Sequence, residues 1–119
     1  MQSQQIRPLT GTFTATIANA GTVSDVIEVG DFACGFFAIP AAFTGIAITF
    51  QISSARDGTF VDAYNAANTA ISITVAVSRA YPIPPQVMAA HSFKLVSGTS
   101  EGAARSIVCS FKSVGVANP

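Results

Sequence analysis

The segment 46–53 constrains the fold more than any other stretch of the sequence. It reads Ile-Ala-Ile-Thr-Phe-Gln-Ile-Ser, with a large apolar residue at every second position. Because successive side chains of a β-strand point to opposite faces, this alternation gives one apolar face and one face of small, uncharged groups. The apolar residues are Ile46, Ile48, Phe50 and Ile52, and the other face carries Ala47, Thr49, Gln51 and Ser53. We expect a strand of a two-layer β-structure, whose second face is a candidate contact for a neighbouring subunit.

The same alternation recurs along the chain at intervals of about 8–12 residues, which is typical of a sandwich or barrel. In segment 70–78 it places Ile71, Ile73, Val75 and Val77 on one face. Further strands are expected in segments 10–19, 23–29, 32–39, 60–64, 92–96 and 104–112. The proline-rich segment 81–85 suits an edge strand or an ordered crossing, and segment 86–90 a single helical turn. The sequence predicts an all-β fold: an antiparallel two-sheet sandwich, jelly-roll-like, with about eight strands and no substantial helix.

Three aromatic residues need a special explanation in such a sandwich. Phe36 and Phe37 are adjacent, so in a strand one of them enters the core and the other needs different cover. Phe43 stands in the expected loop 41–45 and also needs a partner.

The length of 119 residues is sufficient for one domain with its own core. We expect an extended N-terminal arm at residues 1–9, a β-sandwich domain at 10–113 and a C-terminal tail at 114–119. The arm is polar and contains Pro8. Two interpretations stay open: a frayed terminus, or an arm that becomes ordered only against a neighbouring subunit.

The charge content is low and balanced, with six basic and six acidic residues and only 10% charged residues in total. Average domains carry about 25%. A surface with so little charge is poor at keeping copies apart, which favours a protein that works in an assembly. Nucleic-acid binding is not expected because a basic excess is missing, and membrane insertion is not expected because no long apolar run exists. The N-terminal residues lack the apolar core of a signal peptide, so we expect synthesis in a cytoplasm.

Residues that carry out chemistry are scarce. His91 is the only histidine, and its neighbour Ser92 is expected to point away from it, so a catalytic triad is not supported. Cys34 and Cys109 are expected to be free thiols. Asp57 and Gly58 suit a turn better than a calcium loop. We predict no enzyme activity and no catalytic, cofactor-binding or metal-binding residue.

Three stretches together resemble a known group of proteins. They are segment 40–45 with the following strand and segment 57–60, then segment 78–84, and finally segments 93–99 and 103–107. Over about residues 12–112 the chain resembles small virion proteins of tailed bacteriophages that have a jelly-roll or galactose-binding-like sandwich. The resemblance implies a non-enzymatic capsid decoration or cement protein on the virion surface. Such a protein would bind the outer surface of the major capsid protein lattice as a symmetric homo-oligomer, a dimer or trimer, and stabilise the head.

The candidate interface residues follow from the arm and from aromatic residues without an assigned place in the core. They are Gln4, Gln5, Ile6, Arg7, Pro8, Phe37, Phe43 and Tyr81. The alternative hypothesis is a carbohydrate-binding or receptor-binding module of a virion tail or fibre. Its aromatic platform would come from Phe37, Phe43, Tyr64 and Tyr81.

Overall fold

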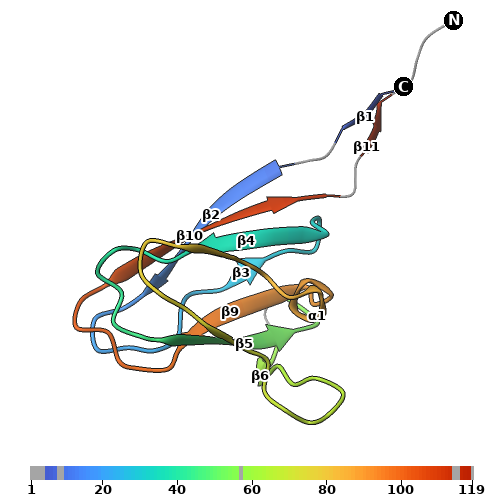
Figure 1. Cartoon of the computed structure of the whole chain (residues 1–119). Coiled ribbons are helices and arrows are strands. Elements are labelled where there is room, and N and C mark those ends of the chain that lie inside the picture. Colours follow the sequence, from blue (N-terminus) through green and yellow to red (C-terminus); the bar gives the residue numbers. More distant parts are fainter. Residues whose placement is uncertain (1–4, 8–9, 57, 114–115, 119) are drawn as a thin grey trace, which may run out of the picture.

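Two antiparallel β-sheets lie face to face in the computed structural model, which describes residues 5–7, 10–56, 58–113 and 116–118 (Figure 1). The first sheet has the order β2 (Thr10–Ile17), β10 (Arg105–Lys112), β4 (Cys34–Ala38), β8 (Ala80–Pro82). The second sheet contains β3 (Ile27–Glu28), β9 (Ser92–Ser97) and β5 (Ala47–Ser53), in that order, and then β6 (Val61–Asp62) and β7 (Ser72–Thr74). Both β6 and β7 pair with β5.

The order of the strands is that of a jelly roll. Nine strands form the two sheets, and because β6 and β7 pair with successive parts of β5 they count as one interrupted strand. The eight resulting strands then follow the order first, eighth, third, sixth in one sheet and second, seventh, fourth, fifth in the other. The predicted all-β, jelly-roll-like sandwich is therefore confirmed.

The core lies between the sheets and uses the inward half of each alternating segment. Edge-on contacts join Phe37 to Phe50, Phe50 to Phe93 and Phe93 to Phe111, so an aromatic row crosses from one sheet to the other. Burying each such ring contributes about 2–3 kcal/mol. Phe37 is fully buried while Phe36 is 45% exposed on the opposite face of β4, which confirms the expected division of the adjacent pair.

Two expectations about strand faces are wrong. Ile46 is 73% exposed, because β5 begins only at Ala47 and Ile46 lies before the regular alternation. Val77 is 46% exposed, because β7 ends at Thr74 and the chain turns at Ser78, whose φ is 59°. The regular spacing of β-branched residues therefore overstates the length of both strands.

A single short helix occurs among the described residues, α1 (Pro85–Met88), which confirms the expected helical turn. Within these residues no helix has the length and apolar character needed to cross a membrane. The buried Val87 and Met88 hold α1 against the end of the sandwich.

A two-stranded ribbon extends from the sandwich at the end where β2 begins and β10 ends (Figure 1). It consists of β1 (Gln5–Arg7) and β11 (Val116–Asn118), paired antiparallel with Ile6 opposite Ala117. The N-terminal arm thus pairs with the C-terminal end of its own chain.

Candidate interaction surface

The outer side of the first sheet forms a surface that we call the first-sheet face. Its residues alternate with the buried ones along β2, β10, β4 and β8, and are therefore directed away from the core. They are Thr12, Thr14, Thr16, Ser106, Val108, Ser110, Lys112, Cys34, Phe36, Ala38, Ala80 and Pro82. Lys112 is the one charged residue of this set and lies at its end.

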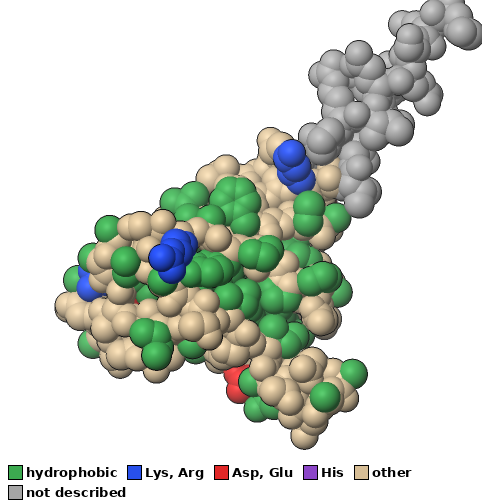
Figure 2. All heavy atoms as spheres, viewed as in Figure 1, with side chains coloured by type: hydrophobic (Ala, Val, Ile, Leu, Met, Phe, Trp, Pro, Cys, Tyr) green, Lys and Arg blue, Asp and Glu red, His purple; other side chains and the backbone are tan. Residues whose placement is uncertain are grey.

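The centre of the first-sheet face is apolar. Phe36 and Val108 are 45% and 42% exposed, respectively. Strand register places Phe36 opposite Pro82 and Val108 opposite Ala38, so these four side chains lie on adjoining positions of three strands. Figure 2 shows the wider context: in this view hydrophobic side chains are spread over the sandwich and charged side chains are few.

A hollow of about 400 Å³ lies at one end of this face and is lined by Gly11, Cys34, Gly35 and Phe36 among others. The two glycines are required by the rings beneath them. A Cβ atom at Gly11 would collide with Phe32, and one at Gly35 would collide with Phe111. The backbone at both glycines therefore packs directly against aromatic rings of the core.

The two cysteines are free, as predicted, and their surroundings differ. Cys34 is exposed in the hollow of the first-sheet face. Cys109 is fully buried, and burial, with a smaller effect of the negative charge of Asp25, raises the pKa of its thiol to about 12. Cys109 is thus an inert core residue.

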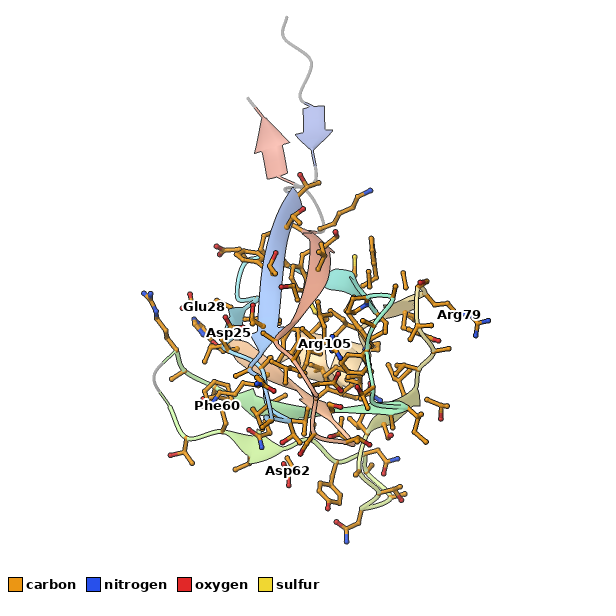
Figure 3. The ribbon with its side chains drawn as sticks, turned by 90° about the vertical axis from the view of Figure 1, so that its left-hand side faces the viewer. Asp25, Glu28, Phe60, Asp62, Arg79 and Arg105 are labelled. Carbon is orange, nitrogen blue, oxygen red and sulfur yellow. The ribbon has the colours of Figure 1, made fainter. Side chains whose placement is uncertain are left out.

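The outer side of the second sheet, the second-sheet face, is charged and partly covered by the chain itself. The ammonium of Lys94 lies 4.6 Å from the centre of the Phe60 ring. Glu28 forms an ion pair with Arg56 at 2.6 Å, between largely exposed side chains. Figure 3 shows Phe60, Asp62 and Glu28 on this part of the molecule. Thr49, from the strand face that the sequence favoured as a subunit contact, is only half-exposed here.

The two sheets are joined at one end by the carboxylate of Glu101, whose side chain is completely buried. Its oxygens accept hydrogen bonds from the amides of Thr44 and Gly45, at 2.9 and 3.0 Å, and from Ser97 Oγ at 3.3 Å. The guanidinium of Arg105 donates to it at 3.0 Å. The carboxylate therefore links the loop before β5 to the loop before β10.

The environment of Glu101 favours its charged form. Burial alone would raise the pKa of this carboxyl group, but the hydrogen bonds from Thr44, Arg105, Gly45 and Ser97 together lower it below its ordinary value of 4.5. A buried and fully bonded carboxylate of this kind has a structural role. Sequence analysis missed it because none of its four partners forms a motif in the sequence.

His91 is exposed between two hollows of about 680 and 500 Å³. Contrary to expectation, it does not point away from Ser92: its Nδ1 lies 2.9 Å from Ser92 Oγ, because His91 precedes β9 and is outside the strand alternation. Among the described residues no hydrogen bond or ion pair joins His91 to a carboxylate. The described residues likewise contain no group of three His, Cys, Asp or Glu side chains arranged to hold a metal ion.

The predicted interface residues are divided by the structure. Phe37 and Phe43 are 0% and 5% exposed, so we correct the expectation that they contact a partner: both are core residues. Tyr81 is half-buried against Phe37, and its hydroxyl accepts a hydrogen bond from the amide of Ala76 at 2.8 Å. Tyr64, from the alternative aromatic platform, is 54% exposed.

That the arm residues form an interface stays a prediction. Gln5, Ile6 and Arg7 form β1, whereas Gln4 and Pro8 lie outside the described residues. The sequence did not predict the first-sheet face as an interface, because alternation gives the outward residues of each strand but not which outer face the rest of the chain leaves uncovered. Comparison with known proteins gives no assignment: no family model matches the chain, and neither does any curated protein.

Proposed function

We propose that this protein is a non-enzymatic structural protein of a bacteriophage virion, a capsid decoration or cement protein that binds the major capsid protein lattice through its first-sheet face. The observation that supports this most is the composition of that face. It exposes Phe36 and Val108 in the centre of a surface with one peripheral charge, Lys112. Protein contacts of this kind have apolar centres depleted of charge.

The phage setting is supported by the resemblance in sequence. The jelly roll is compatible with it, since this architecture recurs in capsid proteins, although it is also found in lectins and does not by itself determine function. A decoration protein acts by many modest contacts that a repeating lattice multiplies. A surface of Thr, Ser, Ala, Val and Phe with little charge suits such repeated contacts.

The test is the number of copies in purified virions of the phage that encodes the protein. Binding to a symmetric capsid lattice predicts on the order of hundreds of copies per particle, removed by a denaturant before the head itself dissociates. A few copies per particle would place the protein in the tail. Absence from purified virions would overturn the proposal.

One observation favours carbohydrate binding as a second candidate. The 500 Å³ hollow is lined by Phe13 and Phe32 together with the polar side chains of Glu28, Asp31, Arg56 and His91. An exposed ring beside hydrogen-bonding groups is a common arrangement for sugars. This candidate predicts hits on a glycan array that Phe13→Ala abolishes. An array without hits at high protein concentration would exclude it.

A further inference from the structure

One long edge strand of the sandwich has no partner on its outer side along most of its length. β2 is an edge strand of the first sheet and has 8 residues, whereas the other edge strands, β8, β3, β6 and β7, have two or three each. Proteins protect long edge strands with charges, proline or bulges, because the unpaired amide and carbonyl groups of such a strand can pair with a further strand. The segment 10–15, Thr-Gly-Thr-Phe-Thr-Ala, contains neither a charge nor a proline.

The contacts of Thr16 show which backbone groups face outward. Its amide donates to Asp25 Oδ1 at 2.8 Å, and its carbonyl accepts from the amide of Asp25 at 3.2 Å. The backbone of Thr16 is therefore directed away from β10. Because this direction alternates along a strand, the backbone groups of Thr10, Thr12 and Thr14 also point outward. In the described part of the chain none of these three positions has a hydrogen-bond partner on that side.

We propose that β2 pairs antiparallel with β2 of a second copy, about a two-fold axis at Thr12. In this register Thr12 faces its own equivalent, and Thr10 faces Thr14 of the second copy. All three open positions are then used, giving about six hydrogen bonds between the chains. A shift toward the N-terminus would bring in Pro8, which has no amide hydrogen. A shift toward the C-terminus would bring in Thr16, which is already bonded to Asp25.

The same register explains an exposed aromatic residue. Phe13 is 39% exposed, although its ring contacts Phe32 and Phe111 with centroids 6.1 and 5.7 Å apart. With Thr12 on the axis, Phe13 stands opposite Gly11 of the second copy. The space above Gly11 is already filled by the ring of Phe32 of the same chain. Phe13 would therefore lie beside Phe13 of the second copy, at the diagonal position across the pair, which aromatic side chains can reach. Self-pairing would thus cover both copies of Phe13.

The consequence of this pairing is a continuous sheet of eight strands in which two first-sheet faces lie side by side. A dimer of this form would present the apolar surface twice and could bind a repeating lattice at two points. The pairing concerns the isolated protein and does not rest on the proposed virion function.

The first experiment measures the mass of the purified protein by light scattering after size exclusion. We expect a dimer for the wild type. Thr12→Pro removes the central outward amide, and an edge strand tolerates proline. We expect this variant to be folded by circular dichroism and monomeric by light scattering. Thr12→Ala keeps the amide and should remain dimeric. A monomeric wild type, or a dimer that Thr12→Pro leaves intact, would overturn the proposal.

The second experiment fixes the register and does not depend on the folding of the proline variant. In a Cys34→Ser background, Thr12→Cys should form a disulfide-linked dimer under mild oxidation, because the paired Cα atoms would be about 5.5 Å apart. Thr14→Cys alone should not, since its two copies would be about 14 Å apart. A mixture of Thr10→Cys and Thr14→Cys should cross-link. Equal cross-linking of Thr12→Cys and Thr14→Cys would refute the axis at Thr12.

The two proposals fail in different ways. Phe36→Glu should leave the mass and the cross-linking unchanged, because Phe36 lies in β4 on the sheet face and not in the edge strand β2. Loss of the dimer in this variant would contradict self-pairing through β2. Failure to find the protein in virions would leave these results untouched.

Discussion

The two sheets have similar inner faces and different outer faces. Both inner faces are apolar and interlock through the aromatic row from Phe37 to Phe111. The second-sheet face carries charged side chains that the chain itself satisfies, with Phe60 over Lys94 and Arg56 on Glu28. The first-sheet face leaves Phe36 and Val108 uncovered.

This difference separates what specifies the fold from what remains for a partner. The inner faces are sufficient for a sandwich, because they bury most of the inward-facing Ile, Leu and Phe residues of the long strands. An outer face needs no apolar residue for that purpose. Phe36 and Val108 are exposed apolar side chains that lie on neighbouring strands of one outer face and that the fold does not need, and a contact with another protein would cover both.

The largest effect is expected from a charge on the first-sheet face. Phe36→Glu should weaken binding to capsids lacking the protein by about 1,000-fold, or about 4 kcal/mol, because a carboxylate would be buried without a partner. Binding is measured by co-sedimentation over a range of protein concentrations.

The matched control places the same charge on the other sheet. Thr49→Glu lies on the second-sheet face and should leave capsid binding within about 3-fold of the wild type. If Thr49→Glu abolishes binding and Phe36→Glu does not, the roles of the two faces are reversed.

A substitution of Glu101, which joins the two sheets, should lower stability and leave both outer faces unchanged. Glu101→Gln puts an amide group where four donors converge, and should lower the free energy of unfolding at pH 7 by about 3 kcal/mol in urea denaturation. The pKa of Glu101 is lowered in the folded state, so its charge stabilises the fold above pH 4.5 and this contribution is lost as pH falls through the folded-state pKa. The difference between wild type and variant should therefore narrow in acid. A difference that stays constant down to pH 2 would exclude this role of the carboxylate.

Sequence periodicity predicted the inner faces well and the outer faces poorly. The alternation in segment 104–112 predicts that Ile107, Cys109 and Phe111 face the core, and all three are buried. The same alternation gives Val108 an outward position but does not state whether another segment covers it. For Lys94, cover comes from Phe60, more than thirty residues earlier, and for Glu101 two of the four donors are the amides of Thr44 and Gly45, more than fifty residues earlier. Such long-range cover depends on topology, which local spacing does not encode.

Cys34 provides a chemical probe of the first-sheet face. In the free protein its exposed thiol should react with iodoacetamide, whereas the buried Cys109, with its raised pKa, should stay unmodified. On decorated capsids the reaction of Cys34 should slow by about 10-fold, because the hollow around it would be covered. Mass spectrometry of the two peptides gives both rates. Equal rates for Cys34 in free and bound protein would indicate that this end of the face stays open to solvent.

The smallest effect tests whether the second-sheet face is closed by its own chain. Phe60→Ala removes the ring over Lys94 and should lower the free energy of unfolding by about 1 kcal/mol, since a cation–π contact at a partly exposed site contributes about this much. Tyr64→Ala, an exposed ring from the same part of the chain, should change it by less than about 0.5 kcal/mol. Capsid binding should be unaffected by both variants, because neither residue belongs to the first-sheet face. Tighter binding by Phe60→Ala would mean that uncovering Lys94 exposes a second contact surface, and the contrast between the two faces would then be one of access and not of composition.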